Sequence, residues 1–439
     1  MSWQKVRLGQ FLKNREGRYK PNDKAIQGLK RIDKINFSGT IFLSDKPSNT
    51  DMILVKKGDL VISGINVEKG AMNIYHGEED VVATIHYSSY EFDEEKIDID
   101  FLTNFLKSLE FKKALKEQVP GGIKTEIKPK HILPLIVEIP TDVQEQKRIV
   151  KELIENNLII ENASSELTHQ LNLIKQLRQA FLREAIQGKL VKSTINEETG
   201  QQLLAKIKAE KAQLIAEKKL KKEKELAPIM EDELPFEIPE HWAWCRLGEI
   251  ISHTENLDIH KKLSSETIIN YVDIASIDNK NYLIKEVKKS TVEELSTRAR
   301  RVLKKDYIIY STVRPYLKNI AIVENELPNF IGSTGFNVFK PINSNIKYLF
   351  YFLLNPDLNK MYEEMMVGFN SPSITNEQFE NTLFPLPPLH EQEQIVAKLE
   401  ELMEFCDGLE QSIKDSQGYN EMLLQQVLRE ALHNNKKKD

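Results

Sequence analysis

Arg314 is the residue whose type and surroundings point most directly to a chemical role. It lies in the stretch TVRPYLKN (residues 312–319), directly after the apolar run DYIIYS, which predicts a strand. Pro315 has a fixed φ and favours a tight turn, so we expect the turn to hold the arginine in place. A guanidinium on a rigid turn donates paired hydrogen bonds to a phosphate or to the edge of a nucleic-acid base.

Residue patterns typical of enzymes are missing from the sequence. It has no Gly-x-x-x-x-Gly-Lys-Ser/Thr loop for nucleotide phosphates and no His-Glu-x-x-His helix for zinc. The Asn/Asp-Pro-Pro-aromatic and Phe-x-Gly-x-Gly segments expected of an adenine methyltransferase are missing as well. Cys245 and Cys406 are far apart, which argues against a zinc cluster or a disulfide framework and favours a reducing cytoplasm. We therefore expect a non-catalytic chain that binds no metal and no cofactor.

Composition sets broad limits on the fold and its partners. The 439 residues allow two to four domains. A net charge of −5 argues weakly against a nucleic-acid partner, although local patches rather than the total charge decide such binding. The longest apolar run, YLFYFLL at 348–354, is too short to cross a bilayer, and the N-terminal residues lack the apolar core of a signal peptide. We expect a soluble protein without a membrane partner.

The sequence contains an internal repeat. The pattern Trp-x-x-x-Arg-Leu-Gly starts at Trp3 and again at Trp242, Glu-Gln occurs at 145–146 and 391–392, and Leu-Arg-Glu-Ala begins at residues 182 and 428. The distance from Glu-Gln to Leu-Arg-Glu-Ala is the same in both copies, whereas the distance from the tryptophan pattern to Glu-Gln differs. Each copy therefore has a globular part of variable length followed by a helical part of fixed length.

The helical parts, 143–187 and 390–432, carry apolar residues at alternating four- and three-residue steps, which is a heptad pattern. We expect the two helices to pack on each other, although each could instead be a long helix that packs on its own domain. Asn156, Ala163 and Gln170 are the expected polar or small steps of the first helix. The contacts should include Ile149, Leu153, Leu167, Leu399, Leu409 and Leu423.

Residues 201–225 predict a further helix with a thin apolar side and a lysine-rich end, followed by a proline-rich linker at 226–242. A charge run of this kind is typical of a solvated helix face, which we favour over a nucleic-acid patch.

The chain resembles the specificity subunits of Type I restriction–modification systems. The resemblance is carried by the two Trp-x-x-x-Arg-Leu-Gly starts, by PLPPLHEQEQIVAKLEEL (385–402), by LRQAFLREAIQGKLV (177–191) and by LPFEIPEHWAWCRLGEI (234–250). It covers nearly the whole chain. One departure is IPTDVQEQ in the first copy, where the family more often has Pro-Pro-Leu-x-Glu-Gln.

The resemblance implies an α+β fold with two α/β target-recognition domains in pseudo-two-fold arrangement, separated by a long antiparallel two-helix spacer of coiled-coil type. The implied parts are target-recognition domain 1 (1–141), a central helical region (142–200), a second helix with linker (201–239), target-recognition domain 2 (240–388) and a C-terminal helical region (389–439).

The implied role is defence against foreign DNA. This chain would read a bipartite, asymmetric target in double-stranded DNA and position two methyltransferase subunits, which act on adenine N6, and two restriction subunits. Those partners would use S-adenosylmethionine, ATP and Mg, whereas this chain would bind no cofactor itself.

Residues that read bases do not transfer from a family, because recognition domains diverge where they touch DNA. Polar and basic residues in predicted loops are the candidates. In the first domain they are Arg15, Arg18, Lys20, Lys30, Arg31, Asn66, Lys69, Lys124 and Lys128; in the second they are Lys261, Lys262, Arg298, Arg300, Arg301, Arg314, Lys318, Asn370 and Ser371. Any one of them could equally be a solvated surface residue.

Two alternatives remain open from the sequence. A coiled-coil scaffold without DNA contacts would show no salt-dependent binding to duplex DNA. A fused restriction–methylation enzyme would bind a cofactor as a purified chain, yet no segment of methyltransferase size is left over.

Overall fold

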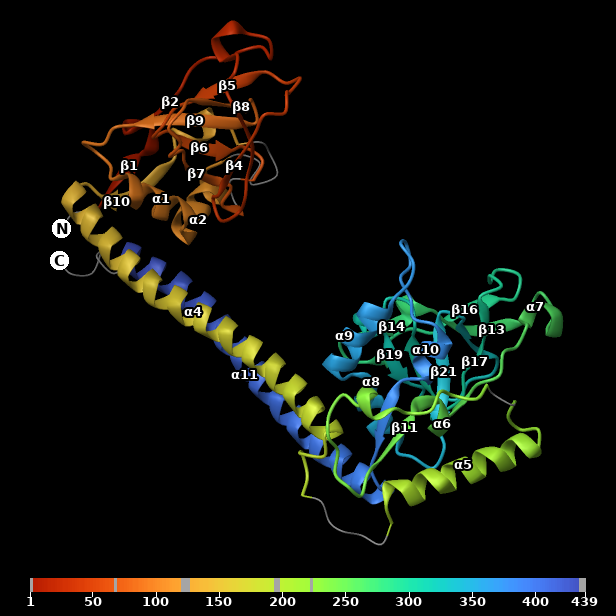
Figure 1. Ribbon diagram of the computed structural model, residues 1–439. Helices are drawn as coiled ribbons and strands as arrows, with labels where there is room; N and C mark the ends of the chain where they lie inside the picture. The colour runs from red at the N-terminus through yellow and green to blue at the C-terminus, as the bar shows by residue number, and fades with distance from the viewer. Residues whose placement is uncertain (1–2, 67–68, 120–126, 193–197, 222–223, 434–439) are drawn as a thin grey trace. The chain divides into compact units, whose positions relative to one another are not determined.

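The computed structural model describes residues 3–66, 69–119, 127–192, 198–221 and 224–433. The chain forms two compact units, residues 1–169 with 413–439 (unit 1) and residues 170–412 (unit 2). Each unit combines a globular part of strands and short helices with segments of two long helices (Figure 1). The predicted α+β class with a pair of long helices is thus confirmed. Among the residues described, no helix has the length and apolarity that crossing a membrane requires.

The described part of unit 1 forms two four-stranded sheets, ordered β2-β9-β6-β7 and β4-β3-β8-β5, and a two-stranded sheet of β1 with β10. Strands β3 and β8 pair in parallel. The strands are β1 (Trp3–Arg7), β2 (Leu12–Asn14), β3 (Arg31–Ile35), β4 (Ile41–Ser44), β5 (Met52–Val55), β6 (Leu60–Ser63), β7 (Met72–Ile74), β8 (Val81–Thr84), β9 (Tyr87–Phe92) and β10 (Ile136–Pro140). The helices are α1 (Ile99–Lys107), α2 (Leu109–Gln118), α3 (Pro129–Ile132) and the first part of α4 (Val143–Ile186).

Unit 2 repeats this strand order, with sheets β12-β21-β18-β19 and β16-β13-β20-β17, a parallel pair of β13 with β20, and a two-stranded sheet of β11 with β22. The hairpin β14-β15 is an addition. The strands are β11 (Ala243–Arg246), β12 (Ile251–His253), β13 (Ile268–Val272), β14 (Ile277–Asp278), β15 (Leu283–Ile284), β16 (Lys288–Thr291), β17 (Ala299–Val302), β18 (Ile308–Ser311), β19 (Ile320–Ile322), β20 (Phe330–Ser333), β21 (Phe336–Pro341) and β22 (Leu383–Leu386). The helices are α5 (Gly200–Ala216), α6 (Leu247–Ile250), α7 (Ile259–Lys262), α8 (Ile346–Leu353), α9 (Pro356–Met365), α10 (Asn376–Glu380) and the first part of α11 (Leu389–His433).

The central strands β6 and β18 are buried on both faces, which explains their continuous apolar sequences. Successive side chains of a strand point to opposite faces. Leu60 and Ile62 therefore join the core that contains the helix α1 residues, while Val61 joins the core of the second sheet. In unit 2, Ile308 and Ile309 divide in the same way between two cores.

The repeated Glu-Gln pair joins each long helix to its globular part. The Gln146 side chain donates to the Pro140 carbonyl (2.8 Å) and accepts from the backbone N–H of Asp98 (2.6 Å). The Gln392 side chain donates to the Pro387 carbonyl (2.9 Å) and accepts from the backbone N–H of Asn345 (2.8 Å). We call these two sets of contacts the glutamine bridges. Both glutamines are completely buried, so replacing either amide would leave buried backbone groups without a partner.

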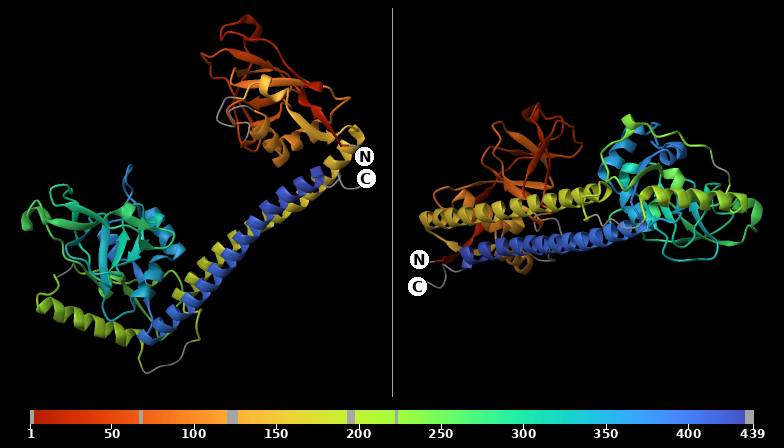
Figure 2. Two further views of the ribbon diagram at one scale, coloured as in Figure 1. Left: turned by 180° about the vertical axis from the view of Figure 1, so that it is seen from behind. Right: turned by 60° about the horizontal axis from the view of Figure 1, so that its bottom comes forward.

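Helices α4 and α11 lie side by side and run antiparallel in both views of Figure 2. Val427 packs on the unit 1 core that contains Ile149 and Leu153, and Asn420 donates to Ser164 (3.4 Å). In unit 2, Leu399 shares a core with Leu182. Also in unit 2, Arg178 of α4 donates to Asp407 (2.6 Å) and Glu410 (3.1 Å) of α11. The predicted pairing is therefore confirmed.

The inner face of this helix pair differs from the predicted one at several steps. Leu409 and Leu423 were predicted contacts, yet they are 37% and 49% exposed. Their neighbours Glu410 and Leu424 are less exposed, and on α4 Asn157, Ser164 and Arg178 are less exposed than Asn156, Ala163 and Leu177. At these steps the less exposed residue is the neighbour of the predicted one, and at Glu410 the reason is its ion pair with Arg178 across the helix pair.

Helix α5 packs on unit 2 with Leu203, Leu204 and Ile207 buried. Buried Lys211 donates through Nζ to the carbonyls of Gly248 and Ile251 (2.9 Å for the latter). The helix ends at Ala216, so it is shorter than the predicted 201–225, and residues 222–223 lie outside the described part. Lys211 therefore has a structural role within the thin apolar side.

Arg246, from the second Trp-x-x-x-Arg-Leu-Gly pattern, fastens the linker to unit 2. Its guanidinium donates to the carbonyls of Ala227 (3.1 Å), Pro228 (3.0 Å) and Asn381 (2.8 Å) and to the Glu233 carboxylate (2.6 Å). The residue is only 6% exposed. Its counterpart in the first pattern, Arg7, is exposed.

We predict that Arg246→Ala lowers the free energy of unfolding by about 2–4 kcal/mol, because it leaves several buried acceptors and the Glu233 carboxylate without their donor. The matched variant Arg7→Ala should change it by less than about 0.5 kcal/mol. Thermal and denaturant unfolding of both variants measure the difference. Equal effects of the two substitutions would contradict this account of Arg246.

Candidate nucleic-acid interface

The same backbone framework closes one end of each globular part. In unit 1 the N–H of Gly64, after β6, donates to the His86 carbonyl, and the N–H of Ile127 donates to the Gly64 carbonyl. In unit 2 the N–H of Thr312, after β18, donates to the Gly335 carbonyl, and the N–H of Ile374 donates to the Thr312 carbonyl. Loops of different sequence therefore start from matching positions in the two units.

In unit 2 this framework brings Arg314 together with the loop 367–373. Arg314 has a left-handed backbone (φ 50°) before the Pro315–Leu317 turn. Its N–H donates to the Pro372 carbonyl (2.8 Å) and its Nη2 to the Asn370 carbonyl (3.1 Å). Ser371 is exposed in the same loop. The predicted turn after a strand is confirmed, and the candidates Arg314, Asn370 and Ser371 are neighbours.

Lys318 adds positive charge next to this turn. Its Nζ donates to the Leu354 carbonyl (3.4 Å). Burial lowers the pKa of Lys318, and the nearby Lys175 of α4 lowers it further. The nearby Glu363 carboxylate raises the pKa of Lys318, so charges of both signs lie near this ammonium group. Lys175 is exposed and was missed by the sequence-based list.

The other candidates of unit 2 gather near β17. The backbone carbonyl of Arg298 accepts a hydrogen bond from the N–H of Thr334, which precedes the Gly335 of the framework. Arg300 and Lys261 both approach Asp258 (3.6 and 3.8 Å), and Lys262 follows in the same short helix. Arg301 donates to Asn256 (3.1 Å), and burial lowers its pKa. These residues form a second basic group, separate from the Arg314 turn.

In unit 1, Arg15, Arg18 and Lys128 line a pocket of about 310 Å³, together with His86 and Tyr87. The Arg15 guanidinium is bonded to the buried Asp59 carboxylate (2.6 and 2.8 Å), which raises the pKa of Arg15. Ser89 also donates to Asp59 (2.7 Å). Arg15 therefore supports the fold, whereas Arg18 and Lys128 are exposed at the pocket.

The remaining candidates of unit 1 do not line this pocket. Asn66 and Lys69 follow β6, and the Lys69 ammonium lies 5.4 Å from the centre of the Phe37 ring. Arg31 donates to Asp33 (2.8 Å), while Lys20 and Lys30 are exposed on the surface. Lys124 lies outside the described residues.

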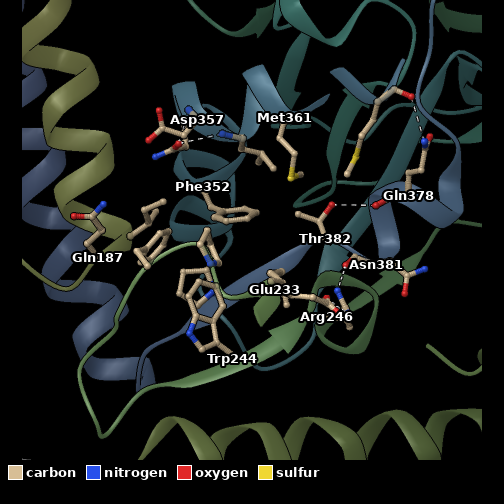
Figure 3. Close-up of a pocket in the computed structure, with 18 of the residues that line it drawn as sticks. Gln187, Glu233, Trp244, Arg246, Phe352, Asp357, Met361, Gln378, Asn381 and Thr382 are labelled. Atoms are coloured by element: carbon tan, nitrogen blue, oxygen red, sulfur yellow. Dashed lines mark hydrogen bonds and ion pairs between the residues drawn. The ribbon is translucent and has the colours of Figure 1, made fainter. Parts of the chain in front are cut away.

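A larger pocket of unit 2, about 990 Å³, lies between the linker, the α8–α10 helices and the end of α4 (Figure 3). Trp244, Phe352 and Met361 point into it, and Arg246 with Glu233 borders it. None of the candidate DNA-contacting residues lines this pocket. It is therefore a feature of the domain body rather than of the loop end.

A family description and several known proteins match parts of this chain. Residues 239–416 match the family described as the Type I restriction modification DNA specificity domain. The chain is 32% identical over 268 residues to the Type I restriction enzyme EcoAI specificity subunit of Escherichia coli, which covers 58% of this chain and 44% of that protein. Part of the chain is thus similar to Type I specificity subunits.

A second relative shows the same similarity. The EcoEI specificity subunit of Escherichia coli is 33% identical over 270 residues, covering 58% of this chain and 43% of that protein. This chain thus spans less than half the length of these two relatives. The HsdS subunit from Thermoanaerobacter tengcongensis has a TM-score of 0.53 at 16% identity, covering 98% of this chain and 96% of that chain. A chain from a structure of type I R-M complex assembly has a TM-score of 0.57 at 16% identity, covering 98% and 97%. These solved structures have the same fold.

We predict different effects for Arg15 and Arg18, although both arginines line one pocket. Arg15→Ala should lower the free energy of unfolding by about 2–4 kcal/mol, because it leaves buried Asp59 without its cationic partner. Arg18→Ala should leave stability within about 0.5 kcal/mol and weaken binding to duplex DNA. Thermal unfolding and fluorescence anisotropy with labelled duplex separate the two effects. Full stability of Arg15→Ala would refute the structural role of its ion pair.

Proposed function

We propose that this chain is the DNA-reading subunit of a Type I restriction–modification complex and that each unit reads one half of a bipartite target. The observation that carries the proposal is the pair of matching frameworks with different side chains. Asn66 and Lys69 follow β6 where Arg314 and Lys318 follow β18. Identical readers suit palindromic targets, whereas a shared scaffold with different contact residues suits two different half-sites.

Local charge supports DNA as the ligand although the net charge is −5. Arg314, Lys318 and Lys175 gather at one end of unit 2, and Arg18 with Lys128 at the matching end of unit 1. Guanidinium and ammonium groups bind phosphates, and a guanidinium on a fixed turn also fits the edge of a guanine.

The long helices supply the distance between half-sites in this proposal. A helix of about 40 residues extends about 60 Å, which is ample to separate two readers by one DNA turn of about 34 Å. Because the glutamine bridges fasten each helix start to its own globular part, helix length would be transmitted to the readers.

Apolar side chains on the outside of the helices support partner subunits. Ile154, Leu158 and Met422 are 56%, 57% and 68% exposed in unit 1, and Phe405 is 59% exposed in unit 2. Ile154 and Leu158 are four residues apart on one face of α4, and contiguous exposed apolar surface marks protein interfaces. We assign these faces to two methyltransferase subunits that act on adenine N6, with two restriction subunits joining the complex. S-adenosylmethionine, ATP and Mg would bind to those partners in the cytoplasm, and the chain itself would be non-catalytic.

The first test exchanges one reader. Replacing residues 10–135 with the equivalent part of a relative should change one half of the methylated target and leave the other half intact, because each framework is closed within its own unit. Methylation-sensitive sequencing of genomic DNA, from cells that also express the cognate methyltransferase, gives the target. The unmodified chain is the control. A change in both half-sites would disprove independent readers, and the absence of salt-dependent binding to duplex DNA would favour a scaffold role.

The second test changes the helix length. The sequence alone places matched insertion points near Ala163 and Leu409, but Ser164 contacts Asn420, so the second point belongs near Asn420. Seven residues added to both helices preserve the heptad register and add about 10 Å. We predict a gap between half-sites longer by about three base pairs, at about 3.4 Å per pair.

The control inserts seven residues into α4 alone, which should break the pairing of the helices and abolish assembly with the methyltransferase. Target mapping of the double insertion decides the matter. An unchanged gap with full methylation would mean that the helices do not set the spacing.

A further inference from the structure

The Phe369 side chain is the most exposed large apolar group among the described residues. It is 100% exposed, whereas the next, Tyr419, is 69% exposed. An aromatic ring that stays in water does not gain the free energy of burial, which is about 25 cal/mol for each Å² of apolar surface. A ring in this position contributes nothing to the fold, so its presence needs another explanation.

The loop that carries Phe369 is held at its base. Val367 and Ser373 exchange two backbone hydrogen bonds (3.0 and 3.1 Å), and Gly368 takes a φ of 111° that side chains rarely adopt. The Pro372 carbonyl accepts from Arg314, and Ile374 donates to Thr312. The ring is therefore presented from a fixed base, and binding through it costs less conformational entropy than binding through a free loop.

Polar, basic and apolar groups lie around the ring: Val367 is 68% exposed in the same loop, and Tyr316 and Leu317 are each 39% exposed in the turn after Arg314. Asn370 and Ser371 are exposed next to it, and Arg314 bonds to the Asn370 carbonyl. Lys318 and Lys175 add charge at the same end of unit 2. Cations beside a fully exposed ring fit a ligand with phosphates outside and flat apolar surfaces inside.

We propose that Phe369 inserts into the base stack of the half-site that unit 2 reads, a proposal that rests on the proposed function. Every base has an apolar face on which an aromatic ring can stack, and apolar wedges between base steps unstack and kink a duplex. Arg314 and Lys318 neutralise phosphates beside the inserted ring. A locally opened step also lowers the energy needed to turn an adenine out of the helix for methylation.

The insertion is specific to one half-site. The backbone framework aligns Ile374 with Ile127, so the segment of unit 1 that corresponds to the Phe369 loop is 119–126. Its sequence, VPGGIKTE, contains no aromatic residue. We therefore expect an unstacked step in the half-site of unit 2 and an ordinary stack in the half-site of unit 1.

The experiment uses the full chain assembled with its methyltransferase subunits and a duplex that carries the mapped target. Single 2-aminopurine bases, whose fluorescence rises on unstacking, replace successive positions. We expect one bright step in the half-site of unit 2, which Phe369→Ala abolishes while weakening target binding about 10-fold, as loss of one stacked base predicts. Phe369→Leu should keep part of both effects, because it keeps an apolar wedge.

Ile268→Ala is the matched control, since Ile268 is an apolar residue that is 53% exposed at the first position of β13, outside the Phe369 loop. It should change neither binding nor fluorescence. Three results would overturn the insertion: wild-type fluorescence in Phe369→Ala, loss of subunit assembly in that variant, or a binding loss that replacing thymine by uracil reproduces, which would indicate a contact to a methyl group. A wild-type complex without target preference would overturn the proposed function as well.

Discussion

The buried amides of Gln146 and Gln392 are the contacts on which the rest of this structure depends. Each amide donates to the proline carbonyl before a long helix. It also accepts from the backbone N–H of the residue that precedes a short helix of the globular part, Asp98 before α1 or Asn345 before α8. An amide is suited to this position because it donates and accepts at once and carries no charge that burial would penalise. The orientation of each helix relative to its own globular part is thereby fixed by hydrogen bonds that require one specific geometry.

Fixing the helix start in this way frees the opposite end of the domain to vary. The cores of the two units divide alternate residues of β6 and β18 between the same two layers, and these layers need only apolar side chains of suitable volume. The loops at the framework end carry no such requirement. Arg314 and Phe369 can therefore differ from their counterparts in unit 1 without cost to the fold.

Sequence reasoning found the elements that depend on periodicity and failed where side-chain partners decide. The repeat, the strands β6 and β18 and the pairing of the two long helices follow from sequence spacing, whereas the antiparallel direction of the pair came from the family resemblance. Spacing could not predict whether Leu409 or Glu410 faces inward, because the Glu410 carboxylate is held there by a hydrogen bond from Arg178 on the opposite helix. The candidate list likewise included Arg15, whose partner Asp59 is distant in sequence, and omitted Phe369, because the rule applied was to select polar groups. Its position between Gly368 and Asn370 in a predicted loop was the available signal.

The exposed apolar side chains of the helix pair also affect how readily the chain is degraded in a cell. The inner face of the pair includes Asn157, Ser164 and Arg178, while Ile154, Leu158 and Phe405 are turned to water. Apolar side chains left in water make a chain a target for the chaperones and proteases that remove unfolded or unassembled protein. A newly made chain would be safest when a partner covers these side chains at once. Its abundance would then follow the supply of that partner, because the uncovered excess would be degraded.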